Sequence, residues 1–287
     1  MGYDHVRPDR EALLDLDVES RIKLMLGDIW VDIAPSESVF KVMNNMANVP
    51  KRITAPALLV TGLGGTGKSA IVKEIPNRVT RSEGLLTISM ASDPDLMKRK
   101  EFRTEIYQKL ELPCPPIHRK SSVADLVTRE LSEILKLRKI WGLVIDEIHD
   151  MLLCGKVEQR INSSMLKAFL GESYGISLFA FGTPKANSFI SAITETQRRF
   201  SVIELEDWKE DESFRTFLLG VEELLPLKRS SRLYDQDKVF AILAATSGRM
   251  DNVMNLIRSA GCYALRDGTE AISLEHLAKA SASPWGF

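Results

Sequence analysis

The feature that most constrains this chain is a glycine-rich turn between a short apolar run and a helix-compatible segment. The run Ala57-Leu58-Leu59-Val60-Thr61 predicts a buried β-strand, and it leads into Gly62-Leu63-Gly64-Gly65-Thr66-Gly67-Lys68-Ser69. The turn fits the phosphate-binding P-loop pattern G-x-x-x-x-G-K-[ST], in the strand-to-helix setting that the pattern requires. We therefore expect an α/β protein.

The residue types of this turn suit a triphosphate ligand. Glycines have no Cβ, so successive backbone N–H groups can turn toward phosphate oxygens, and the following helix adds N–H donors and the positive end of its dipole. Lys68 is expected to reach the β- and γ-phosphates and the Ser69 hydroxyl to ligate Mg²⁺. The predicted nucleotide-binding residues here are Gly62, Gly64, Gly65, Thr66, Gly67, Lys68, Ser69 and Ala70.

A second apolar run, Trp141-Gly142-Leu143-Val144-Ile145, ends in two carboxylates, Asp146 and Glu147. Ligand chemistry in parallel sheets lies at the carboxyl ends of the strands. Asp146 is expected to hold Mg²⁺, and Glu147 to orient or deprotonate an attacking water, with Lys68 as a further catalytic group. The alternative for the acidic pair alone is a helix N-cap after a strand. The P-loop upstream favours an ATPase that uses ATP and Mg²⁺.

Composition and charge exclude several other classes of protein. Of the 287 residues, 44% are hydrophobic and 27% charged, which is ordinary for a globular protein. No apolar run approaches the roughly 20 residues that span a bilayer, and the N-terminus lacks a secretion signal. Three scattered cysteines and four histidines form no disulfide or zinc pattern, so we expect a cytoplasmic protein without a membrane. The net charge of −1 does not indicate a nucleic-acid-binding protein, so any DNA contact must come from local basic patches or from summation over an oligomer.

Predicted strands and helices alternate along the first two thirds of the chain, which favours a parallel sheet. The expected strands are 57–61, 85–89, 141–147, 176–184 and 202–205. One helix is expected from Ser92 through Leu110, another ending near Leu137, and a third over 158–170. After Trp208 the pattern is helical only, over 210–225, 236–246, 250–266 and 273–281.

We expect an N-terminal helical segment packing on the core (1–50), an α/β core (51–207) and an α-helical lid (208–287). Trp30, in the first of these, is expected either to line an adenine pocket or to lie in the core.

This layout is similar to that of AAA+ ATPases, which have a P-loop core with a parallel five-stranded sheet followed by a small helical lid. The resemblance implies that Thr183 is a polar sensor near the γ-phosphate; alternatively, it is a strand-terminal turn residue. It implies that Arg199, or Arg198, is an arginine finger acting on a neighbour's site, the alternative being a solvated surface pair. It further implies that Arg249 couples the lid to the nucleotide. Together these residues imply an active site between subunits, and hence a ring or a helical filament.

The chain more closely resembles the TniB/TnsC-type ATPases, the helpers of DDE transposases in Tn7-like elements, from about Arg21 to the C-terminus. The resemblance is carried by Trp30, Leu58–Gly62, Gly67-Lys68-Ser69, Ile145–His149, Gln159-Arg160, Phe181-Gly182-Thr183, Arg199-Phe200 and Leu224-Leu225-Pro226-Leu227-Lys228-Arg229-Ser230-Ser231-Arg232-Leu233. The last stretch has no part in nucleotide chemistry and is the most specific to this family. One departure is Gly64-Gly65-Thr66, where many relatives carry an Asn-rich turn.

The family resemblance implies an ATP-dependent homo-oligomer on double-stranded DNA that marks a target site and recruits a DDE transposase. Hydrolysis would dismantle the assembly, and a target-selector protein is a further expected partner. Summed contacts to the DNA backbone would give salt-dependent binding with little base recognition. The candidate DNA-binding residues lie between the second and third core strands, and for each the alternative is a solvated helix face: Lys98, Arg99, Lys100, Arg103, Arg119 and Lys120.

Two other functions remain open at this point. A replication initiator or helicase loader shares the AAA+ chemistry, but an initiator usually appends a winged-helix domain and this chain ends soon after the lid. A nucleotide-gated interaction module, in which turnover is incidental, is the other alternative.

Overall fold

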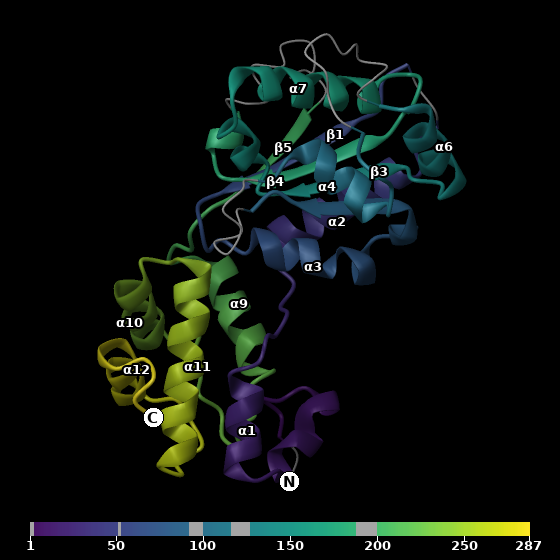
Figure 1. Ribbon diagram of the computed structural model, residues 1–287. Helices are drawn as coiled ribbons and strands as arrows, with labels where there is room; N and C mark the ends of the chain where they lie inside the picture. Colours follow the sequence, from purple (N-terminus) through teal and green to yellow (C-terminus); the bar gives the residue numbers. More distant parts are fainter. Residues whose placement is uncertain (1–2, 51–52, 92–99, 116–126, 188–199) are drawn as a thin grey trace. The chain divides into compact units, whose positions relative to one another are not determined.

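The computed structural model describes residues 3–50, 53–91, 100–115, 127–187 and 200–287. The chain forms two compact units, shown in Figure 1. Residues 35–205 make the first unit, and residues 1–34 together with 206–287 make the second.

The first unit contains a parallel sheet, to which the described part of the chain contributes five strands. These are β1 (Ala57–Gly62), β2 (Leu85–Ser89), β3 (Gly142–Asp146), β4 (Ser177–Gly182) and β5 (Phe200–Leu205). Their order in the sheet is β2-β3-β4-β1-β5, and every neighbouring pair is parallel. This confirms the predicted α/β core.

The burial of each strand follows from its place in the sheet. Every residue of β1, β3 and β4 is buried, because inner strands of a parallel sheet are covered on both faces. Strand β2 alternates between buried and half-buried residues, and half of the residues of β5 are exposed, as expected for the two edge strands. Strand β5 starts two residues earlier than the sequence pattern indicated.

Helices cover both faces of this sheet (Figure 1). On one face, α4 (Phe102–Lys109), α6 (Arg129–Leu137) and α7 (Lys156–Leu170) enclose an apolar core with alternate residues of the strands. On the opposite face lies α3 (Lys68–Arg78), and α2 (Ala34–Ala47) lies beside it through hydrogen bonds from Asn44 to Arg78 O and from Thr80 to Asn44.

Two predicted helices are shorter than the sequence suggested. The helix expected from Ser92 through Leu110 is interrupted, because Lys100 and Glu101 are not helical and α4 begins at Phe102. Helix α6 begins only after Thr128, whose hydroxyl accepts a hydrogen bond from the Leu131 N–H and caps the helix. Residues 92–99 and 116–126 lie outside the described part of the chain.

The second unit is helical. It contains the 3₁₀-helix η1 (Pro8–Asp15) and the helices α1 (Val18–Met25), α9 (Glu212–Glu222), α10 (Gln236–Thr246), α11 (Met250–Arg266) and α12 (Leu274–Ala282). The four helices predicted after Trp208 are thus confirmed, with α10 and α11 at the expected residues. None of the described helices combines the length and the apolarity that crossing a bilayer requires.

The expected packing of the whole segment 1–50 on the α/β core is wrong for its first 34 residues, which belong to the helical unit. Ile22 and Met25 of α1 are buried in the same apolar cluster as α9, α11 and α12. The buried guanidinium of Arg21 also donates two hydrogen bonds of 2.6 Å to the Glu270 carboxylate. Only residues from Pro35 onward join the α/β unit.

The family-specific stretch 224–233 folds around one buried carboxylate. Glu222 accepts hydrogen bonds from the Ser230 hydroxyl and from the backbone N–H groups of Ser231, Arg232 and Leu233, at 2.8–2.9 Å. Because buried polar groups need partners, this carboxylate fixes the path of the stretch. These contacts give the stretch a structural role within the helical unit.

Candidate functional site

The site lies at the carboxyl edge of the sheet in the first unit. Strands β3, β4 and β1 are neighbours, and Thr61 pairs with Gly182 while Ile145 pairs with Ala180. The segments that leave these strands therefore meet at one edge: the P-loop after β1, the acidic pair at the end of β3, and Thr183 after β4.

The P-loop leads directly into α3. Gly67 is the N-cap residue of this helix, and its φ of +93° is in the left-handed region. Only glycine adopts this conformation without strain. The first turn of α3 is open to solvent at Ser69 and Ala70. Because the first N–H groups of a helix have no intrahelical partner, this turn is an anion-binding end.

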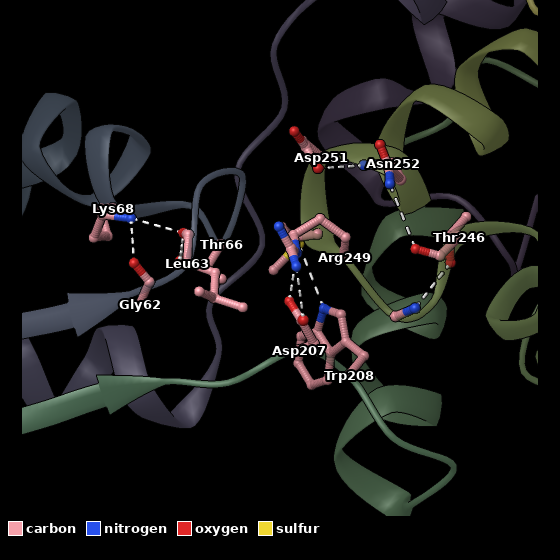
Figure 2. Close-up of polar contacts among 12 residues, drawn as sticks. Gly62, Leu63, Thr66, Lys68, Asp207, Trp208, Thr246, Arg249, Asp251 and Asn252 are labelled. Atoms are coloured by element: carbon pink, nitrogen blue, oxygen red, sulfur yellow. Dashed lines mark hydrogen bonds and ion pairs between the residues drawn. The ribbon is translucent and has the colours of Figure 1, made fainter. Parts of the chain in front are cut away.

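Lys68 is the buried cation of the loop. Its side chain is only 4% exposed, and its Nζ donates to the carbonyl oxygens of Gly62 and Leu63, each at 2.8 Å (Figure 2). The Thr66 hydroxyl donates to the same Leu63 oxygen at 2.9 Å. An anion bound in the loop would offer this ammonium a stronger partner than neutral carbonyls, because charge-assisted hydrogen bonds are about twice as strong.

Ser69 and Asp146 meet directly, since the Ser69 hydroxyl donates to Asp146 Oδ2 at 2.9 Å. The other oxygen of this buried carboxylate accepts the Glu147 N–H at 3.0 Å. Among the described residues, no group of three or more His, Cys, Asp or Glu side chains is arranged so that it could hold a metal ion by itself. One hydroxyl and one carboxylate fit Mg²⁺, which takes few protein ligands and completes its shell with phosphate oxygens and water.

Two features of Glu147 are unfavourable in free energy. Its φ of +55° is in the left-handed region, and its Oε2 is buried without a hydrogen-bond partner. Burial raises the pKa of this carboxyl, and the nearby His149 opposes the shift. A carboxylate with a raised pKa is a better proton acceptor near neutral pH, which suits the predicted general base.

Thr183 directly follows β4, and its hydroxyl oxygen is buried without a hydrogen-bond partner. Its backbone N–H donates to His149 Nδ1 at 3.4 Å, and the same Nδ1 lies 3.0 Å from Glu147 Oε2. The predicted base and the predicted sensor thus share one histidine. The structure brings together Lys68, Ser69, Asp146, Glu147 and Thr183.

Arg249 belongs to the helical unit and is the N-cap residue of α11. There its guanidinium donates to both carboxylate oxygens of Asp207, at 2.7 and 3.1 Å (Figure 2). Its role toward the nucleotide stays a prediction. Arg198 and Arg199 lie outside the described residues. Trp30 is half-buried in the helical unit, and its indole N–H donates to Asp32.

One predicted DNA-binding residue is wrong. Arg103 is only 5% exposed, with its guanidinium 2.5 Å from Pro115 O and 5.0 Å from the centre of the Tyr107 ring. It packs inside the α/β unit, against the Tyr107 ring and the Pro115 carbonyl. Lys100 is half-buried and donates to Ser89 O at 3.1 Å. Lys98, Arg99, Arg119 and Lys120 lie outside the described part of the chain.

Sequence reasoning missed two residues at these sites. His149 was part of a family motif without a role of its own, although its place two residues after Glu147 in a tight turn could have indicated contact. Asp207, the partner of Arg249, lies 42 residues away in the chain and gave no local signal.

The sheet order, the P-loop after β1, the acidic pair after β3 and the polar residue after β4 define a P-loop ATPase of the AAA+ class. Solved structures of this class share the fold. The Aeropyrum pernix ORC1 protein in complex with DNA has a TM-score of 0.63 at 18% identity, covering 91% of this chain and 68% of that one. The A. pernix ORC2 protein in ADPNP–ADP complexes has a TM-score of 0.62 at 16% identity, covering 92% and 72%.

Within this class, the chain belongs to the bacterial TniB protein family, whose family model matches residues 21–210. It is also 26% identical over 245 residues to the ORC1-type DNA replication protein 1 of Sulfurisphaera tokodaii. That alignment covers 78% of this chain and 56% of the relative, so the chain spans little more than half of its length.

Proposed function

We propose that this protein is an ATP-hydrolysing regulator of DNA transposition. It oligomerises on double-stranded DNA, marks a target site and recruits a DDE transposase, and ATP hydrolysis drives disassembly. The observation that carries the ATPase part is the convergence of Lys68, Asp146 and Glu147 at one sheet edge. Membership of the TniB family supports the transposition part.

Each side chain of the site has a separate role in ATP hydrolysis. Lys68 would exchange its two carbonyl partners for phosphate oxygens, and Ser69 and Asp146 are the residues that would hold Mg²⁺. The bound Mg²⁺ supplies positive charge that offsets the charge on the phosphates. Glu147 takes the proton of the attacking water, and Thr183 donates its hydroxyl toward the transferred group. An arginine finger, Arg199 or Arg198, from an adjacent copy completes the site.

DNA binding is proposed to arise from summation over the oligomer. The net charge of one chain is −1, so a single subunit attracts DNA only weakly. The A. pernix ORC1 structure was solved in complex with DNA, which supports this ligand class for a protein of the same fold. Each phosphate contact is expected to make the slope of log affinity against log salt concentration more negative by about 0.9.

The test of this function separates ATP binding, turnover and DNA residence. Replacing Glu147 by Gln is expected to preserve ATP affinity, to lower turnover by about 100-fold or more, and to prolong residence on duplex DNA, since the base is lost but the phosphate-binding groups remain. Phosphate release and single-molecule dissociation from DNA would measure these effects.

Two controls sharpen this experiment. Lys68→Ala should lose both ATP binding and ATP-dependent DNA binding, whereas replacing the exposed Glu172 by Gln should change neither. Unaltered DNA residence in the Glu147→Gln protein would contradict hydrolysis-driven release and favour a nucleotide-gated switch. DNA binding that persists in Lys68→Ala without ATP would contradict ATP-dependent assembly.

A replication-initiator function is the second candidate, favoured by the similarity to the ORC1-type protein of S. tokodaii. The two functions predict different binding to DNA. A transposition regulator is expected to coat duplexes of unrelated sequence with similar affinity, whereas an initiator prefers one origin sequence. Binding to a random-sequence library followed by sequencing would discriminate them, because an enriched motif favours the initiator.

A further inference from the structure

His149 stands between two functional segments of the site. It lies in the 3₁₀-helix η3 (Ile148–Leu152), directly after the Glu147 turn, and its side chain is mostly buried. Its Nδ1 is 3.0 Å from Glu147 Oε2 and 3.4 Å from the Thr183 backbone nitrogen. One ring atom therefore faces both the end of β3 and the end of β4.

The fold makes room for this ring. A Cβ at Gly182, the last residue of β4, would lie 3.3 Å from His149 Nδ1 and 3.1 Å from Ile148 Cγ2. Both distances are shorter than ordinary van der Waals contacts, so a side chain at this position would displace the turn or the ring. The glycine lets the imidazole lie against the backbone of β4.

The carboxylate beside the ring has no other hydrogen-bond partner for its buried oxygen. Glu147 Oε2 lies 3.0 Å from Nδ1 but makes no hydrogen bond with it, so the oxygen is left unsatisfied. An unsatisfied buried oxygen is costly, and a small rotation of the ring or of the carboxylate would turn this approach into a hydrogen bond. The other ring nitrogen, Nε2, is 3.7 Å from Asp150 Oδ1, beyond hydrogen-bond distance.

We propose that His149 is a positioning residue for ATP hydrolysis, whose Nδ1 orients the Glu147 carboxylate relative to the end of β4. This inference rests on the proposed hydrolytic function. The donor holds Oε2, which leaves the second carboxylate oxygen to act on water. Donation to Oε2 requires the proton on Nδ1, whereas the contact with the Thr183 N–H requires Nδ1 without a proton, so this nitrogen serves the base or the end of β4 in turn and not both at once.

The test replaces His149 by Ala, Asn and Gln and measures ATP affinity, kcat and KM with duplex DNA present. His149→Ala is expected to lower kcat by about 10–100-fold, as for other residues that orient a reacting group, while ATP affinity changes less than about twofold. Asn places an amide group near the Nδ1 position and should restore most of kcat. Gln places its amide near the Nε2 position and should behave like Ala.

A double mutant separates positioning from a purely structural role. If His149 acts through Glu147, adding His149→Ala to Glu147→Gln should not lower the residual rate further, because the group to be oriented is already lost. Thermal unfolding of each variant checks that the fold is intact. Equal losses from His149→Ala in the wild-type and Glu147→Gln backgrounds, or no rescue by Asn, would overturn the inference.

The outcomes also distinguish this inference from the function on which it rests. A wild-type protein that binds ATP but does not hydrolyse it would overturn both. A wild-type protein that hydrolyses ATP, with an unchanged kcat in His149→Ala, would overturn only the role of His149.

Discussion

At the scale of single residues, several positions adopt conformations or environments that cost free energy. Glu147 combines a left-handed backbone with a buried, unsatisfied carboxylate oxygen. Such local costs, each of order 1–3 kcal/mol, persist where the surroundings hold the residue firmly. Here the Asp146 carboxylate accepts the Glu147 N–H, and the Glu147 carbonyl accepts the Asp150 N–H.

Gly248 provides a test of backbone constraint beside Arg249. Its φ is +71°, and a Cβ there would lie only 2.1 Å from the Trp208 carbonyl oxygen. Gly248→Ala is expected to destabilise the helical unit by about 3 kcal/mol, because it adds steric overlap to backbone strain. Amide hydrogen exchange of α11 would measure the loss of stability.

A matched control for this prediction is Gly268→Ala. Gly268 has a similar φ of +74°, but a Cβ there would meet nothing within 4 Å. The expected cost is about 1 kcal/mol, the strain of the left-handed region alone. Equal losses in the two variants would show that the approach to Trp208 is not what constrains Gly248.

The sequence predicted those site residues whose role follows from local spacing. Lys68, Ser69, Asp146 and Glu147 each belong to a motif that fixes its own strand-to-turn setting, so one chain segment suffices. The contact of His149 with Thr183 and that of Arg249 with Asp207 join segments 34 and 42 residues apart, for which the chain carries no local pattern; only the contact of His149 with Glu147 is local. Arg103 was misassigned because a basic residue on a helix is usually solvated, and only packing shows that this one is buried.

At the scale of secondary structure, α1 is tied to the α11–α12 loop by one ion pair. Arg21 is 3% exposed and Glu270 16%, and Glu270 also accepts the Lys228 N–H. Glu270→Gln should destabilise the helical unit by about 3 kcal/mol at pH 7, because it leaves a buried guanidinium without its counter-charge. Urea unfolding would measure this, with the exposed Glu275→Gln as a control expected to leave the stability nearly unchanged.

The same pair predicts a pH dependence. Burial by itself would raise the pKa of the Glu270 carboxyl. The hydrogen bonds and the positive charge of Arg21, together with the hydrogen bond from the Lys228 N–H, outweigh burial and hold this pKa below its ordinary value of 4.5. A carboxylate whose pKa is lowered by folding stabilises the protein above pH 4.5 and loses that contribution as pH falls through the lowered pKa. The stability gap between wild type and Glu270→Gln should therefore narrow below pH 4.5. A gap that stays constant with pH would contradict the ion pair.

Helix prediction succeeded where periodicity and caps agree. Helices α10 and α11 have the expected bounds, separated by the turn Ser247-Gly248 with two positive φ angles. The helix expected from Ser92 to Leu110 failed at Lys100 and Glu101, because the apolar spacing continues across these two residues although neither is helical. Periodicity records which residues face a core, and it does not record whether the backbone between them is helical throughout.

At the scale of the whole molecule, the two units have separate apolar cores. Substituting one buried methionine in each core tests whether the two cores are independent. Met25 is buried in the helical unit and Met43 in the α/β unit. Met25→Ala should lower exchange protection in α11, and Met43→Ala should lower it in β1 and β4, by about 2–4 kcal/mol each. Loss of protection in both units from either change would contradict independent cores.

The assignment of the N-terminal segment was the main error of the sequence analysis at this scale. Its amphipathic helices predicted burial, but an apolar stripe does not specify which partner covers it. Only the structure shows that Ile22 and Met25 pack with α9 and α11, and that Val39 and Met43 belong to the α/β unit.

The pairing of α1 with α11 has a consequence for synthesis of the protein. Residues 18–25 leave the ribosome before the α/β unit, yet the helices that bury them are made after it. At ordinary elongation rates the α/β unit can fold while α1 is still exposed, because its partners α9 and α11 follow that unit in the chain. Such long-range closure is slow, so nascent chains should depend on chaperones most strongly after residues 18–25 emerge and before residues 250–266 do.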